Sequence, residues 1–517
     1  LLPGAGYDVS QASMTLKHPS LDYEPIRRTP ASSSSNDMAD AEFHFNRPAT
    51  ALTADEMDSA ESATSRNGAS QRENAAARQG KSDLKSAKEN WIHKHGHSVS
   101  YAGIFLFTAL VFFRPYELSP SLFWLSTSAF WIAVVTVVVY VLTQLGLENS
   151  ITARPKEITL VLLLLVTGAL SIPLALEPQR AFDGFIEFLK VVLIFIIMIN
   201  VVRTEKRLNR LWVLVLAATC ILSISAINDY RLGQFELRGI RIKGLIGGLF
   251  DNPNDLALHL VTMVPIALGF SLKSRNPLTK VLFLIAVILI TSGIVATFSR
   301  GGFLALLAVL GVFIWKIGRN LKWAVPVLAV TGVVVFVLVA PGGYRTRLST
   351  TGDESTLARF DDLKRSLFIA ARHPILGVGM DNYILFSNTD KASHNAYTQV
   401  ASEMGAAAAV FYVLFMLAPL KGLRRIERKS SGLKSERRFY YASIALQASL
   451  IGYMVASFFA SVAYLWYIYY LVAYSVCLRR IYDSAVERDG AIISALNGSS
   501  PNCPEPEVSP NVHFTNI

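Results

Sequence analysis

The sequence predicts an all-α integral membrane protein with about twelve membrane-spanning helices. Hydrophobic residues make up 52% of the 517 residues and charged residues only 17%, whereas soluble domains carry about 25% charged residues. Apolar runs of roughly 17–25 residues, the length that crosses a bilayer as a helix, recur from Tyr101 onward. Short basic loops separate many of these runs, which is typical of the positive-inside rule.

The net charge of +11 raises the question of nucleic-acid binding. Many of the positive residues lie in short loops between apolar runs, where orientation in the bilayer is the commoner cause. No recognition motif or basic helix accompanies the charge, so we expect no nucleic-acid partner. The three cysteines, Cys220, Cys477 and Cys503, are far apart and indicate neither a disulfide framework nor a metal site.

The two ends of the chain differ from its middle. Residues 1–95 lack sustained apolar periodicity, which predicts a disordered cytoplasmic tail. They hold no apolar core with a cleavage site, so we expect no signal peptide. Because the chain begins with Leu1, internal starts at Met14, Met38 or Met57 are alternatives. Residues 481–517 are interpreted as a cytoplasmic tail, which leaves 96–480 as the membrane domain.

The apolar runs lie near residues 100–113, 121–145, 158–176, 184–202, 209–227, 254–272, 279–298, 302–318, 322–340, 395–420, 439–459 and 461–478. Prolines within runs, such as Pro173, Pro265 and Pro326, are tolerated because neighbouring helices can satisfy the freed backbone groups.

Basic residues orient these helices. Four basic stretches fall in alternate loops: Arg203–Arg207, Lys273–Lys280, Lys316–Lys322 and Lys421–Arg438. The positive-inside rule places all four, and both termini, in the cytoplasm. The opposite side then receives Arg114–Pro120, Asn228–Asn254, Ser299–Gly301 and one long loop, 341–394, between the ninth and tenth helices. Arginines on this side contradict the rule, and such residues more often serve function.

The 341–394 loop is the only long polar segment between strongly apolar ones. It supplies the basic residues Arg345, Arg347, Arg359, Lys364, Arg365 and Arg372. Within it, Thr356–Ala371 reads as an amphipathic helix that we expect at the membrane surface. Pro374 ends this helix and Gly377-Val378-Gly379 forms a turn. A solvated basic face is the alternative interpretation.

Arg300 lies in the stretch Thr297-Phe298-Ser299-Arg300-Gly301-Gly302, which joins two apolar runs with almost no loop. The charge must face protein or water, because insertion into hydrocarbon costs about 2.5–3.5 kcal/mol. The two glycines permit a tight turn and close approach of the backbone to a ligand. A guanidinium suits a diphosphate through paired hydrogen bonds. The alternative is an arginine that snorkels from a helix end.

His394 lies in Ser393-His394-Asn395-Ala396-Tyr397, at the outer mouth of a helix that continues through Glu403 and Gly405. A histidine there can titrate near neutral pH and take a proton from an attacking hydroxyl. The alternative is a capping Ser-His-Asn with an exposed histidine. Glu403 lies about two and a half turns further along the helix, where a buried carboxylate suggests a polar contact between helices.

Two other polar features have structural interpretations. Gly244–Asn254 precedes a helix that contains His259, and we interpret His259 as a satisfied interior histidine. Asp183, Glu187 and Lys190 share one helical face and predict a structural charge cluster. The sequence contains no recognised phosphate-binding loop, metal-ligand cluster or nucleotide fold, which argues against energy coupling by a nucleotide.

Together these stretches resemble the O-antigen ligase family of polytopic membrane glycosyltransferases, over about residues 100–480. The matching stretches are Phe250-Asp251-Asn252-Pro253-Asn254-Asp255-Leu256-Ala257, Thr297–Gly302, Arg359 upstream of His373–Gly379, and Ser393–Tyr397 with Glu403–Gly405. The resemblance rests on their order and their placement on helices, since each motif is weak alone. The long polar amino-terminal tail departs from the family pattern.

The resemblance implies a GT-C-like fold and a metal-independent, inverting transfer without a cofactor. The donor would be an undecaprenyl-pyrophosphate-linked glycan at the periplasmic face of the bacterial inner membrane, and membrane lipid would surround the site. The acceptor would be lipid A core, a polysaccharide or a protein hydroxyl. Carried over residue by residue, Arg300 and Arg359 would hold the pyrophosphate, or Arg345 or Arg347 would replace Arg359 in that role. Arg345, Arg347, Arg372 and Asn395 are further substrate-binding candidates. His394 would act as base or orient the acceptor.

Two alternatives use the same architecture. A polysaccharide polymerase uses the same donor and differs only in its acceptor, so the sequence does not separate it from a ligase. A flippase or transporter for a lipid-linked glycan belongs to another class, in which inverted repeats and broken helices surround a midplane site. The sequence shows no convincing internal repeat, and its polar groups gather at one face.

Overall fold

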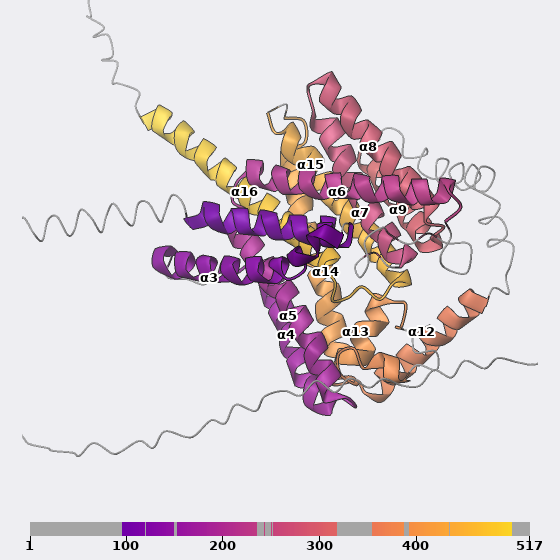
Figure 1. Cartoon of the computed structure of the whole chain (residues 1–517). Helices are drawn as coiled ribbons and strands as arrows, with labels where there is room; N and C mark the ends of the chain where they lie inside the picture. The colour runs from indigo at the N-terminus through magenta and orange to yellow at the C-terminus, as the bar shows by residue number, and fades with distance from the viewer. Residues whose placement is uncertain are drawn as a thin grey trace, which may run out of the picture. The chain divides into compact units, whose positions relative to one another are not determined.

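The computed structural model describes residues 96–118, 120–148, 152–234, 242, 244, 250, 252–317, 354–386, 392–433 and 435–498 (Figure 1). Every regular element in these ranges is helical, which confirms the predicted all-α class. Ten helices in these ranges are long and apolar enough to cross a bilayer. The chain is therefore a multi-pass membrane protein.

The first candidate span, Gly96–Glu117, is interrupted at Arg114, after which α2 (Pro115–Leu118) begins. The remaining elements are η1 (Pro120–Leu125), α3 (Ser128–Glu148), α4 (Lys156–Ser171), η2 (Ile172–Leu174), α5 (Pro178–Val201), α6 (Glu205–Arg231), α7 (Pro253–Lys273), α8 (Pro277–Ala296), α9 (Arg300–Ile317), α12 (Glu354–Arg372), η3 (Tyr383–Phe386), α13 (Ala396–Met404), α14 (Ala406–Ser430), α15 (Arg437–Ala456), η4 (Ser457–Phe459) and α16 (Trp466–Gly498).

Ten of the twelve predicted apolar runs coincide with the ten candidate spans. The run 322–340 lies outside the described residues, as do 1–95 and 499–517. The run 461–478 coincides with the start of α16, which is not among the ten spans and continues as helix through Gly498. The count of twelve and the GT-C-like fold therefore stay predictions.

The predicted run 395–420 is not one helix. It breaks at Gly405 into the short α13 and the membrane-crossing α14. Gly405 has a φ of 88°, and a Cβ there would lie 2.3 Å from the Ile375 carbonyl oxygen. The close approach of a second backbone segment, which no apolar pattern encodes, ends α13 at this point.

The core of the bundle lies around α7 and α15, which pack against each other and against α9. Small residues allow close approach of these helices: a Cβ on Gly269 would meet Ala445 at 2.9 Å, and one on Gly452 would meet Val309 at 2.6 Å. By contrast, α3 and α8 are mostly exposed, as expected of helices that face lipid.

The four predicted basic loops meet at one end of the bundle. Lys273 donates to the Asn209 side chain (2.8 Å), and Arg438 pairs with Glu205 (3.0 Å). In the same region Lys316 pairs with Glu427 (2.5 Å). We call this the basic end. The contacts support the alternation of loops derived from the positive-inside rule, while its cytoplasmic location stays a prediction.

Candidate functional site

Arg300 is the first residue of α9 and is half-buried. The preceding residue, Ser299, is buried, and its hydroxyl donates to the Asn254 side chain (2.9 Å) at the start of α7. The same Ser299 hydroxyl accepts the Gly302 backbone N–H (3.2 Å). The turn is therefore fixed to the first turn of α7, and Arg300 emerges from a rigid helix start.

The two glycines after Arg300 allow neighbouring segments to pack closely against the start of α9. A Cβ on Gly302 would lie 2.6 Å from Ala257 on α7, and one on Gly301 would lie 2.7 Å from Phe459 of η4. The sequence interpretation assigned these glycines to a tight turn and to ligand approach. The structure shows that they pack the start of α9 against α7 and η4.

His394 lies in a turn that ends in a helix cap. The next residue, Asn395, accepts the backbone N–H groups of Tyr397 (2.9 Å) and Thr398 (3.1 Å) through its side-chain oxygen, and so caps α13. His394 itself is half-buried and has a φ of 53°, a conformation that costs energy for a non-glycine residue. The backbone of His394 is thus held in a strained conformation directly before the cap.

Asn395 has a second side-chain group that the cap does not use. Its Nδ2 is buried and makes no hydrogen bond to any residue that the structure describes. A buried amide without an acceptor costs about 1–3 kcal/mol, so a native protein rarely keeps one unless a ligand or water completes it.

The segment 457–463 joins the two turns. Phe459 packs against Gly301 beside Arg300, and the Ser461 hydroxyl lies 3.5 Å from the hydroxyl of Ser393 beside His394. The backbone N–H of Ala463 contacts the Gln399 side chain on α13 (3.4 Å). Arg300 and His394 therefore lie on either side of one short connection at the same end of the bundle, which we call the site end.

Helix α12 agrees with the predicted amphipathic helix, Thr356–Ala371, to within two residues at its start and one at its end. Its protein-facing side carries Asp362, Ser366 and Ile369, all buried. The apolar residues Leu357, Phe360 and Leu367 are instead exposed, as required of a helix whose apolar side lies on a membrane surface. The membrane-surface location stays a prediction.

The arginines of the 341–394 loop differ in position and exposure. Arg359 is half-buried and lies about 60° from Asp362 around the helix axis, next to the protein-facing side. Arg372 is exposed, with its guanidinium over the Phe368 ring (5.8 Å to the centroid). Arg345 and Arg347 lie outside the described residues. Arg365 donates to the Phe386 carbonyl (2.8 Å), so of the three described arginines of the loop, Arg359 has the better position for the site.

The loop after α12 is fastened to the far end of α13. The predicted turn is present, since Gly377 and Gly379 have φ values of 65° and 97°. Glu403, one residue before the end of α13, is buried. Burial raises the pKa of its carboxyl to about 8, despite the nearby Tyr464 hydroxyl, which favours the charged form.

Two polar features were predicted to be structural: His259 and the charge cluster of Asp183, Glu187 and Lys190. His259 is buried, its Nε2 lies 3.0 Å from the Thr219 hydroxyl, and it packs among aromatic rings. It is a satisfied interior histidine, as expected. Of the predicted charge cluster, Glu187 and Lys190 form an ion pair (2.5 Å), whereas Asp183 accepts a hydrogen bond from Gln179.

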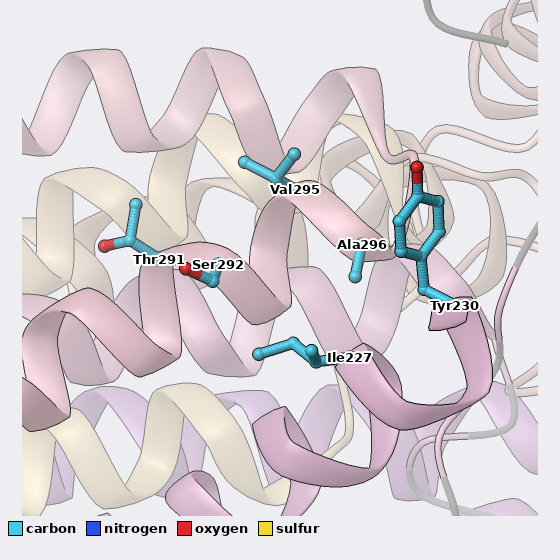
Figure 2. A pocket seen from close by; sticks show the side chains of 6 residues that line it. All are labelled: Ile227, Tyr230, Thr291, Ser292, Val295 and Ala296. Atoms are coloured by element: carbon cyan, nitrogen blue, oxygen red, sulfur yellow. The ribbon is translucent and has the colours of Figure 1, made fainter. Parts of the chain in front are cut away.

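Two cavities flank the site end. One, of about 310 Å³, lies between α6 and α8 (Figure 2). Figure 2 shows Ile227 and Tyr230 on one side and the α8 side chains on the other. The Tyr230 ring lies 5.8 Å from that of Phe298, two residues before Arg300. An apolar space therefore opens next to the Arg300 turn.

The larger cavity, of about 460 Å³, lies between the first helix, α3 and α5. Its walls are mostly apolar and include Ala133, Val134 and Trp466, while Arg114, Glu187 and Lys190 supply its charged groups. Trp466 begins α16 directly after the connection that joins the two turns. Among the described residues, no three His, Cys, Asp or Glu side chains gather as a metal site requires.

Residues 285–413 match a family model described as O-antigen ligase. The match includes the Arg300 turn, α12 and the His394 turn. The match spans about a quarter of the chain and supports its assignment to the O-antigen ligase family. It also supports a membrane enzyme of the O-antigen ligase or polymerase type, from a family that acts on lipid-linked glycans and acceptors in the membrane. No curated protein matches the chain.

Sequence reasoning missed the connection 457–463 between the two turns of this O-antigen ligase domain. Phe458-Phe459-Ala460 reads as part of an apolar run, and the only signal was that two runs nearly abut there. It also missed the contact of Asp381 with Arg180 (3.3 Å), because nothing in the sequence links two residues so far apart.

Proposed function

We propose that this chain transfers a glycan from undecaprenyl pyrophosphate to an acceptor hydroxyl at the periplasmic face of the bacterial inner membrane. The observation that carries the proposal is the shared connection 457–463, which contacts the Arg300 turn through Phe459 and the His394 turn through Ser461. A cation for the leaving group and a base for the acceptor thereby lie at one end of a membrane-spanning bundle.

The reaction needs little beyond these groups. The acceptor oxygen attacks the anomeric carbon from the face opposite the pyrophosphate, so the carbon–oxygen bond to the carrier breaks as the new bond forms, with inversion. His394 accepts the hydroxyl proton. Arg300 and Arg359 stabilise the charge that develops on the departing pyrophosphate, and no metal is needed. Arg345, Arg347 and Arg372 stay predicted contributors to donor binding.

Asn395 has a defined part in this scheme. Its side-chain oxygen is committed to the α13 cap, whereas its buried Nδ2 makes no hydrogen bond to a described residue. A sugar hydroxyl or phosphate oxygen beside His394 would supply the missing acceptor. This arrangement supports the assignment of Asn395 to substrate binding.

The carrier lipid also needs an apolar surface. The cavity between the first helix, α3 and α5 has a volume within the usual range for ligand sites, and Trp466 connects it to the site end. We assign this cavity to part of the polyprenyl chain. Arg114 and Lys190 in its wall suit the phosphate end of such a lipid, with Glu187 holding Lys190 in place.

The test is transfer by the purified protein in liposomes, with an undecaprenyl-pyrophosphate-linked glycan and lipid A core as acceptor. We expect glycan attached to lipid A core, and loss of the product in His394→Ala. Elongated carrier-linked glycan in place of the attached product would assign the chain as a polymerase. Movement of the donor across the bilayer without any new glycosidic bond would overturn the proposal in favour of a flippase.

A further inference from the structure

The far end of α13 holds a buried acid that the proposed reaction does not use. The carboxyl of Glu403 is buried beside the backbone of Asp381 and Tyr383 and the hydroxyl of Tyr464. Its Oε2 does not form a hydrogen bond of ordinary geometry with a described residue. Such a group is costly to bury, which calls for an explanation beyond packing.

Backbone hydrogen bonds fasten the loop after α12 to the same place. The N–H of Gly379 donates to the Glu403 carbonyl (2.9 Å), that of Val378 donates to the Ser402 carbonyl (2.9 Å), and that of Ala406 donates to the Pro374 carbonyl (2.8 Å). The two backbones lie so close that a Cβ on Gly377 would fall 2.3 Å from the Glu403 carbonyl carbon. The loop and the end of α13 therefore form one rigid unit.

Tyr383 extends this unit to α12. Its ring is buried with Ile369 and Val378, and its hydroxyl donates to the Asp362 carbonyl in the middle of α12 (3.1 Å). Asp362 lies one helical turn from Arg359. A chain of contacts therefore runs from the carbonyls of Ser402 and Glu403, through Val378 and the side chain of Tyr383, to the turn of α12 that carries Arg359.

The other side of the same turn is also fixed. The Asn382 side chain accepts the Glu177 backbone N–H (2.8 Å) at the start of α5, and Asp381, with a φ of 56°, pairs with Arg180 (3.3 Å). The turn that contacts Glu403 is thus anchored to a membrane-spanning helix as well. Its strain is consistent with a conformation that the surroundings impose.

We infer that Glu403 and Tyr383 are positioning residues that hold α12, and with it Arg359, at a fixed distance from His394 at the opposite end of α13. The inference rests on the proposed function, because it assigns Arg359 to the leaving group. Preorganised charges stabilise a transition state only if they need not move during the reaction. A loosened α12 would therefore weaken donor binding more than acceptor binding.

Two variants each remove one link of this series of contacts. Tyr383→Phe deletes only the hydroxyl that donates to Asp362. Glu403→Ala removes the buried carboxyl beside the turn, whereas Glu403→Gln keeps a polar side chain of the same size and resembles the protonated acid. The control is Tyr101→Phe, which likewise deletes a tyrosine hydroxyl that donates to a backbone carbonyl, that of Arg207 (2.9 Å), but on the first helix.

The first measurement is a distance and needs no catalysis. Spin labels are attached to cysteines introduced at Ala371 on α12 and Ala407 on α14, both exposed. Double electron–electron resonance then reports the distance between the two helices. Cys220, Cys477 and Cys503 are replaced by alanine so that only the introduced cysteines carry labels. We expect a broadened distribution in Tyr383→Phe and Glu403→Ala, and a wild-type distribution in Glu403→Gln and Tyr101→Phe. A wild-type distribution in both Tyr383→Phe and Glu403→Ala would overturn the inference.

The second measurement is kinetic. Loss of one hydrogen bond should raise the KM for the lipid-linked donor about three- to tenfold in Tyr383→Phe, with the KM for the acceptor unchanged and Glu403→Gln near wild type. A fall in kcat with both KM values unchanged would indicate a smaller folded fraction and would contradict a positioning role. Absence of transfer by the wild-type protein would refute the proposed function. The distance measurement would still test whether Glu403 and Tyr383 hold α12 in place.

Discussion

The two ends of the helical bundle are built on different principles. At the basic end, cations lie in ion pairs: Arg438 with Glu205, Lys316 with Glu427, and Arg479 with the buried Glu157. At the site end, where Arg180 also pairs with Asp381, the backbone is strained as well. All four non-glycine residues with positive φ in the described ranges, Arg114, Phe298, Asp381 and His394, lie in the turns predicted for this end.

The difference indicates where stability and function reside. Ion pairs stabilise the basic end, which the positive-inside rule predicts to be cytoplasmic. Strained residues persist only where the surrounding structure imposes them, and they gather at functional sites. In this chain two of the four strained residues are His394 and Phe298, which is two residues before Arg300. A substitution should therefore affect activity at one end and folding at the other.

The largest expected effect is on catalysis at the site end. We expect Arg300→Ala to lower the rate of glycan transfer by about 10²–10³, the usual effect of removing a group that stabilises transition-state charge. Arg425→Ala, which removes an exposed arginine at the basic end, should leave the rate unchanged. Transfer rates of the purified variants, normalised to folded protein, measure this. Equal rates for Arg300→Ala and wild type would remove Arg300 from the mechanism.

The second effect is on folding at the basic end. Arg479 donates two hydrogen bonds to Glu157, at 2.8 and 2.9 Å, so Arg479→Ala leaves a buried carboxylate without its partner. Breaking a buried pair in this way costs about 3–5 kcal/mol. We expect a lower unfolding temperature and lower yield, with an unchanged transfer rate per folded molecule. A normal unfolding temperature together with lost transfer would contradict the division between the two ends.

The sequence predicted the parts of each end better than their assembly. Helix spans follow from apolar length, the Arg300 turn from two abutting runs, and the α13 cap from Ser393-His394-Asn395, because these signals are local. The break at Gly405 and the connection 457–463 depend on contacts with distant segments. Apolar periodicity contains no information about which backbone will approach a glycine, so these features had to come from the structure.

The third effect is a pH dependence of the stability of the folded protein, caused by Glu403. Burial raises the pKa of Glu403 to about 8 in the folded chain, well above its usual value. The protonated acid therefore favours the folded state fully below about pH 4.5, and this contribution is lost as pH rises through about 8. We expect the wild-type unfolding temperature to fall over this range.

Glu403→Gln cannot titrate, so its unfolding temperature should fall less than that of the wild type between pH 5 and pH 8. Glu487→Gln, which alters an exposed acid on α16, serves as the control and should follow the wild-type profile. Thermal unfolding of the detergent-solubilised proteins across this range measures the effect. Parallel profiles for Glu403→Gln and wild type would show that Glu403 is ionised in the folded state.

The smallest expected effect concerns the lipid cavity beside the site end. Ala133 lines the cavity from α3, a helix that is mostly exposed and should tolerate a large side chain. Ala133→Trp should raise the KM for the polyprenyl donor on the order of tenfold, since about 0.8 kcal/mol is lost for each methylene that is no longer buried.

The length of the lipid decides whether the cavity holds the chain. A donor with a shortened polyprenyl chain should be affected less by Ala133→Trp, because fewer of its methylenes reach the cavity. Leu142→Trp, at an exposed position on the same helix, adds the same ring outside the cavity and should leave the KM unchanged. An equal rise in KM for long and short donors would mean that the substitution disturbs the site end itself, and the assignment of the cavity to the carrier lipid would fail.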